Sequence, residues 1–123
     1  MKVIVCGGRL FSNRAAVFTY LDRLHALRPI TEIAEGGALG ADRLGRAWAR
    51  QHGVPVRTFA AQWIEHGRSA GAVRNAKMLD EFEPDLVVAF PGGKGTEDMV
   101  TQAQRRELIV LSASPGLDAW AGL

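Results

Sequence analysis

The stretch whose residue types best suit anion binding is a glycine-rich turn, PGGKGT at residues 91–96, which follows the apolar run VVAF at residues 87–90. Glycines let backbone N–H groups approach an anion, and the N-terminus of a following helix adds partial positive charge. Lys94 can reach a phosphate, but Gly95 follows it instead of Ser or Thr, so the turn is not a Walker A loop. The alternative is a tight strand-to-helix turn that Thr96 caps. We predict phosphate binding by Gly92, Gly93, Lys94, Gly95 and Thr96.

Two other glycine pairs follow apolar runs. The first is CGGR at residues 6–9, in which Arg9 either clamps a phosphate or lies in solvent. The second is EGGALGAD at residues 35–42, which fails the dinucleotide fingerprint because Ala38 stands where the second glycine belongs. Glu35 can accept a ribose hydroxyl, and Asp42 is better suited to capping the next helix. The predicted ligand-binding residues of these turns are Gly7, Gly8, Arg9, Glu35, Gly36 and Gly37.

A basic segment, HGRSAGAVRNAKM at residues 66–78, supplies a candidate clamp. Arg74 and Met78 are four residues apart, so on a helix they share one face. An arginine on the face that Met78 buries must neutralise a phosphate or a carboxylate of the protein, and we predict that Arg74 binds the ligand. Nearby, His66 is a candidate general acid or base, and Trp63 is either a core residue or a lid that stacks on a base.

The candidate catalytic residues are Glu97 and Asp98, which directly follow the PGGKGT turn. Acidic residues in the first turn of a helix stabilise its dipole without any other role. Alternatively, a carboxylate beside a sugar carbon can stabilise oxocarbenium-like charge or activate water, as cleavage of an N-glycosidic bond requires. Both interpretations remain open.

Strand and helix patterns alternate along the chain. We predict strands at 2–6, 31–35, 54–59, 85–90 and 107–111, and helices from Ser12 as cap to about 27, at 42–52, at 70–82 and at 97–106. This α/β alternation predicts a single Rossmann-like three-layer domain, residues 1–123, with a mainly parallel five-stranded sheet in the order 3-2-1-4-5. The switch point then lies between strands one and four, where the glycine turns meet. Residues 60–71 are not assigned, and the tail, 112–123, lies outside the pattern.

Composition narrows the function classes. A hydrophobic fraction of 47% and a charged fraction of 23% are typical of a soluble globular protein. One cysteine excludes an internal disulfide, and three scattered histidines make a metal site unexpected; no cofactor is indicated. The N-terminus lacks a signal-peptide pattern and no apolar run is long enough for a membrane helix, so we expect a cytoplasmic protein without a membrane partner. A net charge of +2 and basic residues without interleaved aromatics make nucleic acid an unlikely partner.

Four motifs in order, GGRLF, EGGALGADRLGRAWA, W..HG..AG..RN.KML and DLVVAFPGGKGT, resemble the YspA/YpsA-related branch of the SLOG superfamily. The resemblance covers about residues 2–111 of the chain. It implies a Rossmann-like fold and a nucleotide or nucleotide-derived ligand. The superfamily includes the LOG phosphoribohydrolases and the DprA/Smf DNA-processing proteins. Homodimers are common among these relatives, so a homodimer is possible here, and the tail with Trp120 can serve it.

LOG enzymes release the base from a nucleoside 5′-monophosphate, and the resemblance extends to part of their pattern. Arg74 and Met78 match its arginine and methionine, and the PGGKGT turn matches the first six positions of its PGGxGTxxE motif. The last position of that motif, which is the catalytic glutamate in LOG enzymes, is Met99 in this sequence. Two hypotheses follow. We favour a binding module, acting as a sensor or accessory domain; the alternative is a LOG-like N-glycosidase in which Asp98 or Glu97 replaces the glutamate.

Overall fold

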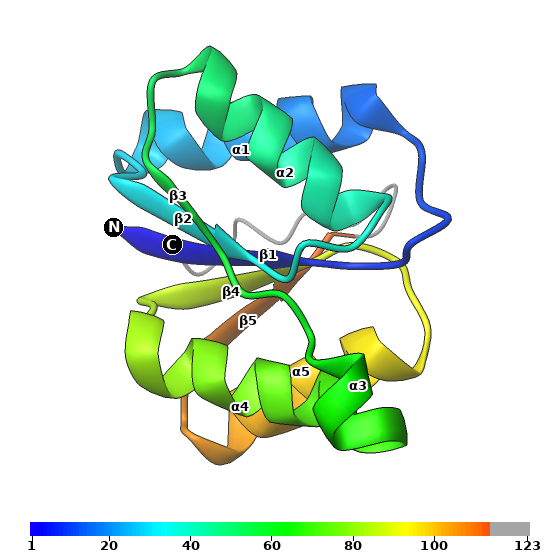
Figure 1. The fold of residues 1–123 in the computed structure, drawn as a ribbon. Coiled ribbons are helices and arrows are strands. Elements are labelled where there is room, and N and C mark those ends of the chain that lie inside the picture. The colour runs from blue at the N-terminus through cyan, green and yellow to red at the C-terminus, as the bar shows by residue number, and fades with distance from the viewer. Residues whose placement is uncertain (114–123) are drawn as a thin grey trace.

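The computed structural model describes residues 1–113 and contains one parallel sheet in the order β3-β2-β1-β4-β5. The strands are β1 (Lys2–Cys6), β2 (Glu32–Glu35), β3 (Val56–Thr58), β4 (Leu86–Ala89) and β5 (Ile109–Ser112). The helices are α1 (Arg14–Leu27), α2 (Ala41–Gln51), α3 (Trp63–His66), α4 (Ala70–Phe82) and α5 (Lys94–Arg105). Helices α1 and α2 cover one face of the sheet, and the other three lie on the opposite face (Figure 1). The predicted fold class and strand order are confirmed.

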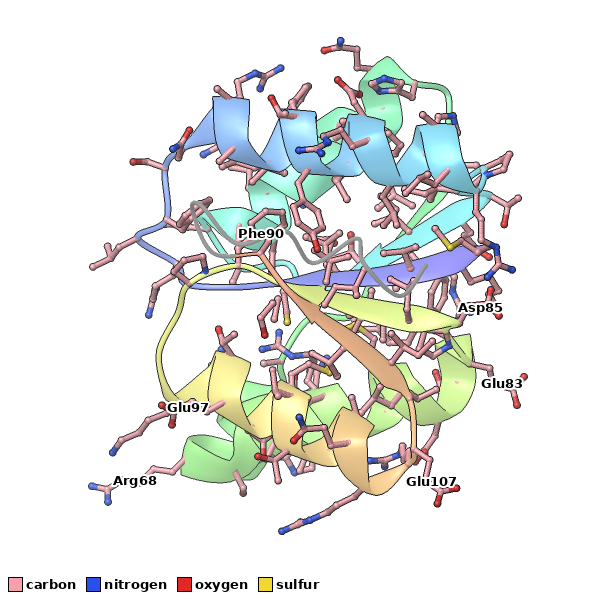
Figure 2. All side chains as sticks on the ribbon, turned by 180° about the vertical axis from the view of Figure 1, so that it is seen from behind. Arg68, Glu83, Asp85, Phe90, Glu97 and Glu107 are labelled. Carbon is pink, nitrogen blue, oxygen red and sulfur yellow. The ribbon has the colours of Figure 1, made fainter. Side chains whose placement is uncertain are left out.

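Strand β1 is apolar and buried from Val3 to Cys6 because both of its faces are covered. Val3 and Val5 pack in the core beneath α1 and α2, whereas Ile4 packs with residues of α4 and α5 such as Met78. Phe90, just past β4, joins the first of these cores and contacts the ring of Phe11 at a centroid distance of 5.6 Å. Figure 2 shows Phe90 within the structure, while the labelled charged residues point outward.

The topology brings the ends of β1 and β4 together at one edge of the sheet. These strands pair in parallel, with Val5 opposite Val88 and Cys6 opposite Ala89. The turns that leave the two strands then lead to helices on opposite faces of the sheet, α1 after β1 and α5 after β4 (Figure 1). The predicted switch point is therefore present.

Some predicted boundaries were wrong. Asn13, and not Ser12, caps α1, because its side chain accepts a hydrogen bond of 3.0 Å from the N–H of Ala16. Strand β3 begins later than predicted, at Val56, because the N–H of Val54 donates to the carbonyl of Ala49 in α2 (2.8 Å) instead of joining the sheet. The unassigned segment forms α3 and a 3₁₀ turn at Gly67–Ser69.

Helix α5 begins at Lys94, three residues earlier than predicted. Gly93 is its N-cap, so Thr96 lies within the first turn and does not cap the helix. Asp98 consequently falls beyond the first turn, and only Glu97 is an acidic residue there. The predicted helix began too late because Gly95, a residue type of low helix propensity, lies in its first turn.

Two further expectations from the sequence concern membrane helices and the oligomeric state. None of the helices in residues 1–113 combines the length and apolar character needed to cross a membrane. Trp120 and the homodimer contact expected of the tail lie outside the described residues. The homodimer stays a prediction.

Candidate functional site

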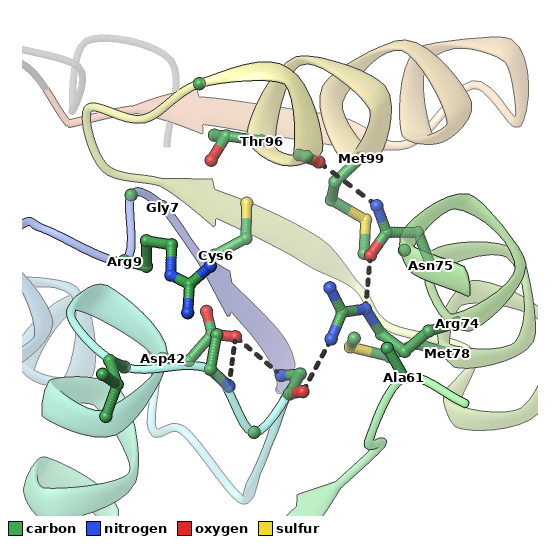
Figure 3. A pocket seen from close by; sticks show the side chains of 18 of the residues that line it. Cys6, Gly7, Arg9, Asp42, Ala61, Arg74, Asn75, Met78, Thr96 and Met99 are labelled. Carbon is green, nitrogen blue, oxygen red and sulfur yellow. Dashed lines mark hydrogen bonds between the residues drawn. The ribbon is translucent and has the colours of Figure 1, made fainter. Parts of the chain in front are cut away.

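The glycine turns meet around one cavity of about 540 Å³ at the switch point (Figure 3). This volume is within the range of small-molecule sites, about 300–1,000 Å³. The cavity is lined by most of the predicted ligand-binding residues, namely Gly7, Gly8, Arg9, Gly36, Gly37, Arg74, Gly93, Lys94, Gly95 and Thr96. Residues that were not predicted as ligand-binding also line it, among them Cys6, Asp42, Trp63, Asn75, Met78 and Met99. The fold thus gathers five chain segments, within residues 5–9, 36–42, 60–63, 71–78 and 93–99, around one space.

The backbones of the turns after β1 and β4 are in direct contact. The N–H of Gly8 donates to the carbonyl oxygen of Pro91 at 2.8 Å. A Cβ added at Gly92 would lie 2.6 Å from the nitrogen of Gly8, closer than a real Cβ can approach. Gly92 does not line the cavity, although it was predicted to bind ligand. The close approach of the two turns explains why residue 92 is a glycine.

The turn after β2 is held by the carboxyl group of Asp42. Its Oδ2 accepts hydrogen bonds from the N–H groups of Gly36 (3.1 Å) and Ala38 (3.3 Å). Gly37 and Gly40 have φ angles of 75° and 74°, a left-handed conformation that favours glycine. The expectation that Asp42 caps its own helix was wrong, because Gly40 is the N-cap of α2 and no side chain caps that terminus.

Asp42 is a cavity-lining carboxyl group that is only 5% exposed. Burial raises the pKa of Asp42 to about 6, and the nearby Glu35 carboxylate acts in the same direction. The hydrogen bonds from Ala38 and Gly36 and the charge of Arg74 oppose this rise. The cavity therefore contains a carboxyl group that changes its protonation near neutral pH.

Arg74 lies on the opposite wall. Its Nη1 donates to the carbonyl oxygen of Gly36 at 2.6 Å, and its Nε donates to Oδ1 of Asn75 at 2.9 Å. Figure 3 shows the guanidinium facing the cavity. None of the ion pairs found in the described residues includes Arg74. A half-buried guanidinium held by neutral acceptors keeps its charge available to an anion.

The N-terminus of α5 forms another part of the wall. No side chain caps it, and its first backbone acceptor, the carbonyl of Gly93, takes the N–H of Glu97 at 3.0 Å. A Cβ at Gly93 or Gly95 would meet nothing within 4 Å, so the surroundings of this terminus are open. An uncapped helix N-terminus carries partial positive charge and several N–H donors, which suit an anion.

Glu35 is placed away from the cavity. It is completely buried, its Oε1 accepts from the N–H of Gly37 at 3.0 Å, and it lies 3.8 Å from Nη1 of Arg46. Because Glu35 does not line the cavity, its position gives no support to the predicted ribose contact. Its hydrogen bond with Gly37 instead stabilises the turn after β2.

The predicted catalytic acids are also outside the cavity. Glu97 is exposed and points outward (Figure 2), and it lines a separate depression of about 310 Å³. Oδ2 of Asp98 accepts hydrogen bonds from Nδ2 of Asn75 (3.0 Å) and Nε2 of Gln102 (2.8 Å). In their place the cavity contains Met99, which is 1% exposed. The geometry gives no support to catalysis by either acid.

His66, the other acid–base candidate, does not line the cavity either. Its Nε2 lies 3.8 Å from a carboxylate oxygen of the neighbouring Glu65. Arg68, in the same segment, extends into solvent (Figure 2). Residues 1–113 contain no group of three His, Cys, Asp or Glu that could hold a metal ion.

Comparison with known proteins places this chain in a family. The model of the YspA, cpYpsA-related SLOG family matches residues 1–66. The Gene 61 protein of Mycobacterium phage D29 is 34% identical over 119 residues, which cover 90% of this chain and 94% of that protein. The chain belongs to this SLOG family. The suspected resemblance is thereby confirmed.

Among solved structures, this SLOG chain is similar to the phosphoribosylglycinamide formyltransferase (purN) of Coxiella burnetii, determined in complex with CHES. The TM-score is 0.44 at 14% identity, and the match covers 76% of this chain. This chain spans only 42% of that enzyme's length.

In this SLOG chain, sequence reasoning overlooked Asp42 and Asn75 as parts of the site. Asn75 is buried and connects α4 to α5, because its Nδ2 donates to the carbonyl of Gly95 and to Asp98 while its Oδ1 accepts from Arg74. A signal was available for Asn75, since a polar residue directly after the clamp is poorly suited to an apolar helix face. For Asp42 the signal was its position just after a turn with several glycines.

Proposed function

We propose that the switch-point cavity binds a nucleotide or nucleotide-derived ligand and that the protein acts as a sensor or accessory module. One observation carries this proposal: the uncapped N-terminus of α5 and the guanidinium of Arg74, which forms no ion pair among the described residues, line the same cavity. Two separate sources of positive charge, neither of which forms an ion pair among the described residues, suit a phosphate. Membership of the SLOG family is consistent with a nucleotide-related role.

The lining residues suggest how such a ligand would lie. Its phosphate would accept hydrogen bonds from the backbone of residues 94–96, with Lys94 and Arg9 as further cations at the cavity wall. Arg74 would clamp the phosphate or its bridging oxygens from the opposite side. Asp42 would accept a hydrogen bond from a ribose hydroxyl, because ionised carboxylates act only as acceptors.

A second candidate, an N-glycosidase, is favoured by one specific feature. Asp42 is a buried carboxyl group whose pKa of about 6 lies near the pH at which acid–base catalysis operates. If the site cleaves a base from its sugar, Asp42 is better placed for the task than Glu97 or Asp98, neither of which lines the cavity. The binding module remains the primary proposal, because the phosphate-binding features require no reaction.

One screen separates these proposals. The protein is incubated with nucleoside monophosphates and nicotinamide dinucleotides, and both the melting temperature and the release of free base are followed. A rise in melting temperature without base release supports the binding module. Base release that is lost in Asp42→Asn but survives in Asp98→Ala and Glu97→Ala supports the second candidate.

The matched variants for this screen are Arg74→Ala and Lys77→Ala. Both remove one cation from α4, but Lys77 is exposed and lies outside the cavity. Arg74→Ala is expected to lose the ligand-induced rise, and Lys77→Ala to retain it. If no nucleotide shifts the melting temperature of the wild-type protein, the proposed phosphate site is wrong.

A further inference from the structure

Trp63 forms the outer wall of the cavity. It is the first residue of α3, it lines the cavity and it is 62% exposed. Of the two roles that the sequence left open, this exposure excludes the core. What remains is a large flat aromatic surface at the mouth of the site, and Trp63 is the one aromatic residue among the described residues that line the cavity.

The neighbouring part of the wall is one stripe of α4. Gly71, Arg74, Asn75 and Met78 are spaced at i, i+3, i+4 and i+7, and all of them line the cavity. A Cβ at Gly71 would lie 3.9 Å from Cη2 of Trp63, so the six-membered ring of the indole lies beside the outer end of the stripe.

Burial of the side chains decreases along this wall from the floor of the cavity to its mouth. Met78 and Asn75 are buried, Arg74 and Gly71 are half-buried, and Trp63 is the most exposed of the five. A ligand whose anionic group is held by Arg74 therefore extends outward past the indole. The part of the ligand that meets Trp63 is the part farthest from the buried floor.

We propose that Trp63 stacks on the aromatic base of the ligand, so that the site takes nucleoside phosphates in preference to plain sugar phosphates. This inference rests on the proposed nucleotide site and specifies its ligand class. Stacking on an aromatic side chain is tolerant of base identity, because every base has a π-face. The other residues of this loop that line the cavity, Ala60 and Ala61, have no polar side-chain atoms with which to read the edge of a base. The four common bases should accordingly bind with similar affinity.

The test compares equilibrium binding of AMP, GMP, CMP and UMP with that of ribose 5-phosphate. Ribose 5-phosphate has the same phosphate and sugar but lacks the base. The wild-type protein should bind the nucleotides about tenfold or more tightly than ribose 5-phosphate, in line with the measured range for base–aromatic stacking. Trp63→Ala should remove most of this difference while leaving the affinity for ribose 5-phosphate unchanged, and Trp63→Phe should retain most of it.

Ile64→Ala is the matched control, because Ile64 is the next residue of α3, is fully exposed and does not line the cavity. It should leave every affinity unchanged. Equal loss in Ile64→Ala and Trp63→Ala, or no loss in Trp63→Ala, would overturn the stacking role while leaving the nucleotide site intact. Wild-type affinity for ribose 5-phosphate equal to that for the nucleotides would do the same. Absence of binding by all five compounds would overturn the proposed function as well.

Discussion

Nη1 of Arg74 donates a hydrogen bond of 2.6 Å to the carbonyl oxygen of Gly36 and so connects α4 to the turn after β2. The same turn is held by Asp42, whose Oδ2 accepts the N–H of Gly36. Gly36 is therefore contacted by an arginine on one side and a carboxyl group on the other. A cation and a carboxyl group in the same cavity, both fixed by backbone groups, can contact different parts of one ligand.

Gly36→Ala is expected to displace the guanidinium of Arg74. The added Cβ would lie 2.7 Å from Cζ of Arg74 and 2.9 Å from Oδ2 of Asp42. Because the obstructing group is the end of a flexible side chain, the fold should survive, whereas nucleotide affinity should fall about tenfold, equivalent to ~1.4 kcal/mol. Calorimetric titration measures the affinity, and urea unfolding measures the stability.

Gly71→Ala serves as the control for this substitution. Its Cβ would make an ordinary contact with Trp63 at 3.9 Å, and replacing glycine by alanine within a helix stabilises by about 0.5–1 kcal/mol. Gly71 also lines the cavity, but this ordinary contact requires no side chain to move, so we expect nucleotide affinity to be retained. If Gly36→Ala binds as tightly as Gly71→Ala, the position of the guanidinium does not matter for binding.

The pKa of Asp42 predicts a pH dependence of stability. Its pKa rises from 3.8 to about 6 on folding, so between these values the folded state holds more protons than the unfolded state. The free energy of unfolding should therefore decrease as the pH rises from about 4 to 6, by roughly 2–3 kcal/mol at most. Arg74 and Glu35 are the charged groups that act on this carboxyl.

Asp42→Asn isolates this contribution, since its amide oxygen can still accept from the backbone of the turn. Urea unfolding of both proteins at pH 4, 5, 6 and 7 should show the wild type losing stability relative to Asp42→Asn up to about pH 6 and remaining constant above it. A stability difference that does not vary with pH would show that Asp42 titrates normally.

The two acids after the PGGKGT turn should differ in their effect on stability. Asp98→Ala removes the carboxylate acceptor of Asn75 and Gln102, and a buried donor that loses its partner costs about 1–3 kcal/mol. Asn75 retains the carbonyl of Gly95, so we expect a value near the lower end of this range. Glu97→Ala, on the exposed side of the helix, should change the free energy of unfolding by less than about 0.5 kcal/mol. Equal losses for both variants would contradict the assigned structural role of Asp98.

The thiol of Cys6 should be unreactive in the folded protein although it lines the cavity. Burial raises the pKa of Cys6 to about 12, and the charge of Asp42 acts in the same direction. The thiolate, which is the reactive form, is consequently scarce at pH 8. Iodoacetamide labelling at pH 8, followed by mass spectrometry, should be slow without denaturant and fast in urea. Rapid labelling of the folded protein would show that the thiol is accessible and ionised.

The sequence was sufficient to predict the sheet order and the place of the cavity. The continuous apolar run of β1 identifies a strand covered on both faces, and right-handed crossovers leave few arrangements for alternating strands and helices. Because the strands are parallel, the glycine-rich turns that follow them must then lie at the same edge of the sheet. These are consequences of chain connectivity, which does not depend on side-chain detail.

The identity of the cavity's carboxyl group was not predictable in the same way. Asp42 lines the cavity because the turn after β2, in which Gly37 and Gly40 have positive φ angles, holds its carboxyl group through the N–H groups of Gly36 and Ala38. The early start of α5 likewise places Met99 in the cavity and turns Asp98 toward Asn75. A shift of a few residues in a helix start, which propensities do not determine, decides which side chains face a ligand.

Backbone amide NMR during a titration with AMP, GMP, CMP or UMP is the most direct measurement of the central proposal, because it reports both binding and its location. The proposal predicts saturable shifts concentrated at residues 7–9, 36–38 and 94–96, with little change at the far ends of α1 and α2. It also predicts that Arg74→Ala weakens the titration and that Lys77→Ala does not. No saturable shift with any of the four nucleotides, or shifts that cluster away from the switch-point cavity, would contradict it.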